Sequence, residues 1–267
     1  MEQQTKRLTV PEFAALKTAG QKITMLTAYD YPMARLLDEA GVDGILVGDS
    51  VSMVVQGHEN TLAVTLDEII YHAEMVGRAT RHALVVVDLP FPTYHVGVHE
   101  AIASAGRILK ETTAQAVKLE GGADQSETIA GLVAAGIPVM AHVGLRPQSV
   151  HQMGGYRVQR DEEVLLHDAE SAQQAGAFAI VLECVPAPIA AKISKTLTIP
   201  TIGIGAGAEC DGQVLVTNDM LGLNGDNVPR FVKKYAAMKE MITDAASRYC
   251  EEIRAGTFPG EAQSYRK

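Results

Sequence analysis

The sequence has few of the residues that mark specialised protein classes. None of its 267 residues is tryptophan, only three are cysteine, and aromatic residues make up 5%. Cys184, Cys210 and Cys250 form no CxxC pair, which argues against a disulfide framework and favours a reducing, cytoplasmic location. No apolar run reaches the roughly 18 residues that a membrane helix needs, and the N-terminal segment lacks the apolar centre of a signal peptide.

Positive charge is also scarce. The chain has 23 Lys and Arg against 32 Asp and Glu, a net charge of −9. Long-range repulsion disfavours nucleic acid and anionic membranes, so we expect neither as a partner. An anionic substrate would need a site made locally positive by a lysine, an arginine or a metal ion. The 47% share of hydrophobic residues is sufficient for a folded core.

Short runs rich in Val and Ile recur along the chain, and a helical pattern separates most of them. Because the runs do not alternate with polar residues, they are typical of strands buried on both faces, as in parallel sheets. The predicted strands are residues 23–27, 44–47, 83–87, 116–119, 138–141, 178–182, 201–204 and 214–216. The predicted helices are residues 32–40, 66–80, 98–112, 125–135, 161–175, 186–196 and 231–254.

This alternation predicts an α/β protein, a single (β/α)8 TIM barrel over residues 1–267. The link from residue 205 to residue 213 is too short for a full crossover helix. A doubly wound open sheet remains the alternative, because periodicity does not distinguish the two.

Polar residues stand at the ends of several predicted strands, where the active site of a parallel barrel lies. In chain order they are Asp49 with Ser50, Asp88, Lys118, Glu120, His142 and Glu183. Any one acidic residue there could cap the following helix. Lys118 lies inside an apolar strand, where an unpaired charge is costly. A purely structural ion pair of Lys118 with a carboxylate is the simpler alternative.

The chemistry of these side chains favours a metal-assisted reaction. Asp49, Asp88 and Glu120 offer hard oxygen ligands without cysteine, a set that suits Mg²⁺. Lys118 beside them would supply positive charge for an anionic substrate. Glu183 has apolar neighbours that would raise its pKa and suit it as a general base, although it could also cap the next helix. His142 is a candidate supporting residue.

The chain also resembles a known family through motifs that occur in order over most of its length. They are 27-TAYD-30, 48-GDS-50, 56-QGH-58, 88-DLPF-91, 117-VKLEGG-122, 142-HVGL-145, 147-PQS-149, 154-GGY-156, 182-LECVP-186 and 202-IGIGAG-207. Each motif alone is weak, but together they resemble the ketopantoate hydroxymethyltransferase family.

The resemblance implies a (β/α)8 barrel that uses Mg²⁺, with metal-site residues Asp49, Asp88 and Glu120. It implies that Asp49, Ser50, Asp88 and Lys118 contact the 2-oxo acid, and that Glu183 is the proton acceptor. The family transfers a hydroxymethyl group from 5,10-methylenetetrahydrofolate to 3-methyl-2-oxobutanoate, which gives ketopantoate for pantothenate and coenzyme A synthesis. Its members are typically homo-oligomers, decamers of two five-membered rings.

The sequence departs from the usual family pattern away from the proposed metal and base. Val51-Ser52 replaces a Leu-Gly pair, Arg146 stands where threonine is common, and Asn218 stands where histidine often precedes Asp219.

Other functions remain open at this point. The nearest alternative is a metal-dependent 2-oxo acid carbon–carbon lyase or aldolase of the same barrel type. In a second alternative Lys118 forms a Schiff base with the substrate. A non-catalytic metabolite-binding protein is the third.

Overall fold

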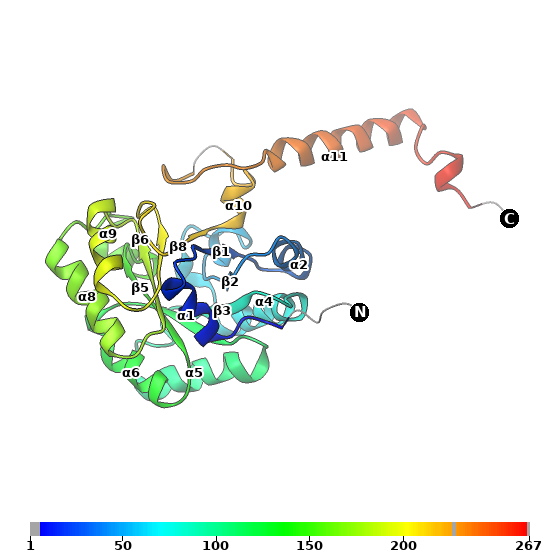
Figure 1. Ribbon diagram of the computed structural model, residues 1–267. Helices are drawn as coiled ribbons and strands as arrows, with labels where there is room; N and C mark the ends of the chain where they lie inside the picture. Colours follow the sequence, from blue (N-terminus) through cyan, green and yellow to red (C-terminus); the bar gives the residue numbers. More distant parts are fainter. Residues whose placement is uncertain (1–5, 226–227, 266–267) are drawn as a thin grey trace. The chain divides into compact units, whose positions relative to one another are not determined.

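Eight parallel strands close into a barrel in which each strand pairs with its neighbours in sequence, and β8 pairs with β1 (Figure 1). The computed structural model describes residues 6–225 and 228–265. The strands are β1 (Ile23–Thr27), β2 (Gly44–Val47), β3 (Leu84–Asp88), β4 (Ala116–Glu120), β5 (Val139–Gly144), β6 (Ala179–Glu183), β7 (Thr201–Ile204) and β8 (Gly212–Leu215). The predicted closed barrel is therefore confirmed, and the open-sheet alternative is wrong.

Helices packed around the barrel follow six of the strands. They are α2 (Tyr31–Glu39), α4 (Leu66–Ala79), α5 (Val98–Glu111), α6 (Ser126–Ala134), α8 (Glu162–Gln174) and α9 (Ala187–Thr196). Local sequence sets where they begin. Thr65 and Glu68 form a reciprocal capping box at the start of α4, and the Asp161 side chain accepts a hydrogen bond from the N–H of Val164 at the start of α8.

Shorter helical turns occupy the loops. They are α3 (Val51–Val54), η1 (Thr61–Ala63), η2 (Ala123–Gln125), η3 (Pro147–Ser149), α7 (Val150–Met153), α10 (Thr217–Met220) and η4 (Glu261–Gln263). As expected, the link between β7 and β8 contains no helix.

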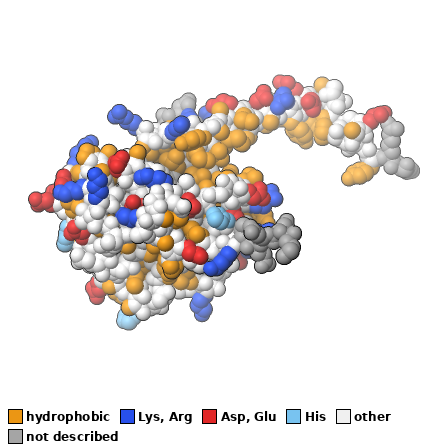
Figure 2. Space-filling view, in the orientation of Figure 1, with side chains coloured by type: hydrophobic (Ala, Val, Ile, Leu, Met, Phe, Trp, Pro, Cys, Tyr) orange, Lys and Arg blue, Asp and Glu red, His pale blue; other side chains and the backbone are white. Residues whose placement is uncertain are grey.

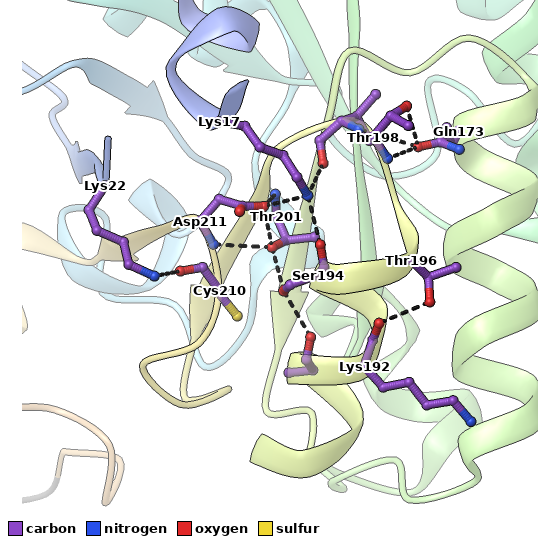
Figure 3. A network of polar contacts seen from close by, with 12 residues as sticks. Lys17, Lys22, Gln173, Lys192, Ser194, Thr196, Thr198, Thr201, Cys210 and Asp211 are labelled. Carbon is purple, nitrogen blue, oxygen red and sulfur yellow. Dashed lines mark hydrogen bonds and ion pairs between the residues drawn. The ribbon is translucent and has the colours of Figure 1, made fainter. Parts of the chain in front are cut away.

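Helix α1 (Val10–Thr18) precedes the first strand and was not among the predicted helices. Its Phe13 is fully buried and packs edge-on against Phe178, just before β6, with ring centroids 6.0 Å apart. Lys17 ties the same helix to the start of β8, because its Nζ lies 2.8 Å from Asp211 Oδ2 and donates to the Ser194 carbonyl (Figure 3). These contacts place α1 at the amino ends of the strands, away from the predicted site.

The last long helix begins later than predicted. Helix α11 runs over Met238–Ala255, not from residue 231. The preceding segment is irregular because its backbone groups bond elsewhere. Tyr235 N–H donates to the Met220 carbonyl and Met238 N–H to the Leu221 carbonyl, each within 3.0 Å. These bonds tie the segment back to the end of α10, so the regular helix starts only after them.

The chain divides into two compact units, residues 1–216 and residues 217–267. The first unit contains all eight strands and the predicted site residues, and the second contains α10 and α11. A single domain over residues 1–267 stays a prediction. None of the helices in the described residues has the length and apolar composition needed to cross a membrane.

Candidate active site

The strands bring the predicted site residues together at the carboxyl end of the barrel. Strand pairing sets Asp88 beside Lys118 and Glu120 beside His142, and both Asp88 and Glu120 are the last residues of their strands. Asp49 lies two residues beyond the end of β2, and Glu183 ends β6. The side chains of Lys118 and Glu120 share one face of β4, because successive side chains of a strand alternate. Asp49, Asp88, Lys118, Glu120 and His142 are each at most 5% exposed.

A buried ion pair joins β3 to β4 in this site. Lys118 Nζ lies 3.0 Å from Asp88 Oδ1, and Asp88 Oδ2 accepts a 2.9 Å hydrogen bond from the Asp49 N–H. Burial alone would lower the pKa of Lys118, but the charges of the nearby carboxylates, Asp88 first, outweigh it and raise the pKa. Lys118 is therefore charged at neutral pH.

Negative charge exceeds positive charge around Lys118. Burial and the nearby Asp88 raise the pKa of Asp49 to about 7. Burial, followed by the charge of Asp49, raises the pKa of Glu120 well above its usual value. One lysine thus faces three buried carboxyl groups, and the site gains stability from an added cation or from protons.

His142 lies between Lys118 and the predicted base. Lys118 Nζ is 3.3 Å from His142 Nδ1, and burial together with the Lys118 charge lowers the pKa of His142 well below its usual value. The imidazole is therefore neutral, with Nδ1 accepting from Lys118 and the proton on Nε2. That Nε2 lies 3.2 Å from Glu183 Oε2, although without the alignment of a formed hydrogen bond.

Glu183 is held at the edge of the site, and its side chain is 18% exposed. Burial raises its pKa to about 7, and the charge of Lys118 partly opposes that rise. Its backbone is fixed on both sides, because the Glu183 carbonyl accepts from Leu145 N–H and the Cys184 N–H donates to the Ile204 carbonyl. Gly144, at φ +96°, leaves room for this: a Cβ there would lie 2.3 Å from the Glu183 oxygen.

Ser50, the remaining predicted site residue, follows Asp49 on the same loop. Its hydroxyl lies 2.8 Å from the hydroxyl of Tyr29, which comes from the loop after β1 and is 5% exposed. The structure therefore places all seven predicted residues in one region and adds Tyr29 as the partner of Ser50.

Two further residues lie in the site that the sequence analysis did not predict. Gln148, in η3, contacts both Asp49 and Glu120, and Tyr94, in the loop after β3, contacts Gln148. The only sequence signal for Gln148 was its place in the 147-PQS-149 motif. Tyr94 had no sequence signal, because it lies six residues beyond the end of its strand.

The donor set fits a hard divalent cation. Within the described residues, buried Glu120 Oε1 has no hydrogen-bond partner, and Asp88 Oδ1 has none beyond its ion pair with Lys118. In the part of the chain that the structure describes, no group of three His, Cys, Asp or Glu side chains is arranged so that it could hold a metal ion by itself. Mg²⁺ does not require one, since it usually takes one or two carboxylates and keeps waters or substrate oxygens as its other ligands.

Together, the closed barrel and the buried charged cluster at the carboxyl ends of its strands have the architecture of a (β/α)8-barrel enzyme. The family model described as ketopantoate hydroxymethyltransferase matches residues 7–261, and the chain belongs to this family.

Relatives named 3-methyl-2-oxobutanoate hydroxymethyltransferase cover nearly the whole chain. The one from Rhodopirellula baltica is 54% identical over 264 residues, which are 99% of this chain and 98% of the relative. The one from Pelobacter propionicus is 53% identical over 268 residues, covering 99% and 100%. The chain is thus a hydroxymethyltransferase, and the family resemblance read from its motifs is confirmed.

Solved structures with the same fold are far less similar in sequence. A phosphoenolpyruvate phosphomutase from Streptomyces platensis subsp. rosaceus has a TM-score of 0.65 at 16% identity, covering 93% of this chain and 88% of that one. A phosphonopyruvate hydrolase solved with oxalate and Mg²⁺ has a TM-score of 0.60 at 13% identity, covering 96% and 93%. At these identities the likeness establishes the barrel fold alone.

Replacing Lys118 with methionine tests the charge balance of the site. The variant keeps the apolar stem but leaves Asp88 unpaired, so we expect unfolding free energy to fall by about 3–5 kcal/mol at pH 8. The pKa values of Asp49 and Glu120 would rise further without the Lys118 charge. The folded variant then binds more protons than the unfolded chain, and its stability falls more steeply than wild type from pH 6 to pH 8.

Urea unfolding of metal-free protein at the two pH values measures this effect. Lys192→Met is the matched control, because Lys192 pairs with Glu162 on the exposed surface and should change stability little at either pH. A Lys118→Met variant as stable as the control at pH 8 would contradict the charge balance described here.

Proposed function

We propose that this site uses Mg²⁺ to transfer the hydroxymethyl group of 5,10-methylenetetrahydrofolate to 3-methyl-2-oxobutanoate, giving 2-dehydropantoate (ketopantoate) for pantothenate synthesis. One observation carries the proposal: three buried carboxyl groups face a single lysine, with Glu183 beside them. Such a site stabilises a divalent cation and an anionic substrate, and it keeps a base of near-neutral pKa within reach.

Asp49 and Asp88 would be ligands of the cation. Glu120 would bind the cation directly or through a water molecule. When bound, Mg²⁺ would draw electron density from the carboxylate and keto oxygens of the 2-oxo acid and so acidify its C3 hydrogen. Burial of the three carboxyl groups strengthens their attraction for the cation, because solvent does not screen the charges of the ionised carboxylates.

Glu183 would take the proton from C3. Burial raises its pKa to about 7, which leaves much of it ionised at neutral pH and still basic enough to accept the proton. The C3 carbon would then bond to the methylene carbon, which the folate carries as an iminium after one of its two carbon–nitrogen bonds opens. Breaking the second carbon–nitrogen bond with uptake of one water would release tetrahydrofolate and leave the hydroxymethyl group on C3. His142 is neutral, and its Nε2 lies 3.2 Å from Glu183 Oε2, so it stands beside that carboxylate without neutralising it.

Lys118 and Ser50 would orient the substrate. The ammonium group of Lys118 would stabilise the substrate carboxylate or the negative charge that develops on the keto oxygen. The Ser50 hydroxyl, held by Tyr29, can donate a hydrogen bond to the same oxygens.

The raised pKa of Lys118 disfavours the Schiff-base alternative. A lysine nucleophile must lose its proton, and the ion pair with Asp88 opposes that loss. Dependence of turnover on methylenetetrahydrofolate separates the transferase from a lyase or aldolase.

A homo-oligomer, a decamer as is typical of the family, is part of this proposal. No residue of α11 is buried, and its Met241, Ile242, Tyr249 and Ile253 are exposed, which supports association with further copies. A cytoplasmic location is also proposed, and the three free cysteines support it. Small molecules rather than nucleic acid or membranes are proposed as partners, because the net charge of −9 disfavours polyanions. Figure 2 shows basic side chains interspersed with acidic ones over the visible face of the barrel unit.

The substitution Glu183→Gln tests the base. It preserves shape but removes the proton acceptor, so exchange of the C3 hydrogen of 3-methyl-2-oxobutanoate with D₂O should fall by about 10²–10⁴-fold. Binding of Mg²⁺ and substrate should persist. In wild type, exchange should rise with pH through about 7 and then level off, because only ionised Glu183 accepts the proton.

Proton NMR of the isopropyl methine follows the exchange directly. Glu163→Gln, on the exposed start of α8, is the control and should exchange at the wild-type rate. Wild-type exchange in Glu183→Gln would move the base elsewhere, with His142 as the next candidate.

The metal-site assignment is tested by Asp49→Ala and Asp88→Ala. Each should abolish Mg²⁺-dependent binding of 3-methyl-2-oxobutanoate in calorimetric titrations while circular dichroism shows a folded chain. EDTA should abolish the same binding in wild type. Asp67→Ala removes an exposed carboxylate paired with Arg107 and should leave binding unchanged. Wild-type affinity in either site variant would exclude that residue as a ligand.

A further inference from the structure

Gln148 links two carboxyl groups that would otherwise repel one another. Its side-chain Nε2 donates to Asp49 Oδ2 at 2.8 Å, and its backbone N–H donates to Glu120 Oε2 at 3.0 Å. Asp49 lies on the loop after β2 and Glu120 ends β4. Burial, followed by the charge of Asp49, raises the pKa of Glu120. One residue from the loop after β5 therefore holds both.

The amide of Gln148 is fixed in one orientation. Its second Nε2 hydrogen is donated to the Leu89 carbonyl at 3.1 Å, and its Oε1 accepts from the Tyr94 hydroxyl at 2.8 Å. A flipped amide would set its oxygen against the Asp49 carboxylate and the Leu89 carbonyl, both acceptors, so only the observed orientation satisfies every partner.

Tyr94 closes this network on Glu120. Its hydroxyl oxygen accepts the Glu120 N–H at 3.2 Å while its proton goes to Gln148. Tyr94 is 1% exposed and Gln148 5% exposed, so neither has water as a ready substitute. Losing one partner would leave buried polar groups unsatisfied.

We propose that Gln148 is a positioning residue for the divalent cation, with Tyr94 as its support: together they hold the Asp49 and Glu120 carboxylates toward one ion. The inference rests on the proposed metal site. Glu120 Oε1 stays free of hydrogen bonds within the described residues, whereas Oε2 is held by Gln148, so the network leaves one oxygen of this carboxylate available. Partners that orient metal ligands typically contribute 10- to 100-fold to affinity, by order of magnitude.

Titration of metal-free protein with Mn²⁺, read by electron paramagnetic resonance of the free ion, tests the proposal without substrate. Gln148→Leu should weaken Mn²⁺ binding by about 10- to 100-fold. Tyr94→Phe keeps the ring and removes a single hydroxyl, so it should weaken binding by about 5-fold, the usual effect of one neutral hydrogen bond.

Gln115→Leu is the matched control. Gln115 is a half-buried glutamine whose amide bridges Leu8 and Val85 backbone groups just before β4, at the opposite end of the barrel. Its loss should lower the thermal midpoint but leave Mn²⁺ affinity unchanged. In activity assays, raising Mg²⁺ should return the kcat of Gln148→Leu toward wild type, which a merely structural defect would not allow.

The Mn²⁺ titrations decide whether Gln148 positions the ligands of the cation. Wild-type Mn²⁺ affinity in Gln148→Leu, or an equal loss in Gln115→Leu, overturns the positioning role alone. Should Gln148→Leu fail to fold, Tyr94→Phe decides: a loss of affinity supports the role, and wild-type affinity overturns it. Wild-type protein that binds no Mn²⁺ at all would overturn the proposed metal site and this inference with it.

Discussion

The buried ion pair between Lys118 and Asp88 is the interaction on which the site depends. It joins two neighbouring strands at the carboxyl end of the barrel with its two charged atoms 3.0 Å apart. Taking both charges out of water is costly. The desolvation of Lys118 is offset by the charges of several nearby carboxylates, Asp88 first.

The remaining charges follow from that pair. Burial, followed by the charge of Lys118, keeps His142 neutral, and a neutral imidazole can lie beside Glu183 without becoming its counter-ion. Burial, followed by the charge of a neighbouring carboxylate, raises the pKa values of Asp49 and Glu120. Because buried carboxyl groups are in excess, the site of the metal-free protein binds either protons or a cation. The proposed reaction uses the cation-bound state.

The sequence predicts the barrel and most of this site because both depend on local patterns. In a parallel barrel the strand ends converge, so Asp88, Lys118 and Glu120 could be placed together from their positions alone. Gln148 and Tyr94 lie on loops, where position depends on tertiary contacts that periodicity does not encode. The start of α11 was misplaced for a related reason, since backbone bonds from Tyr235 and Met238 to the end of α10 override the helical pattern.

Proton release on Mg²⁺ binding tests whether the buried carboxyl groups in excess of Lys118 exchange protons for a cation. Calorimetric titration in buffers of different ionisation enthalpy measures the number of protons released. Proton release is expected between pH 6 and pH 7, because burial and the nearby Asp88 raise the pKa of Asp49 to about 7 and leave it partly protonated before the ion binds; release from Asp49 should fall as the pH rises above 7. Mg²⁺ binding with no proton release anywhere in that range would contradict it.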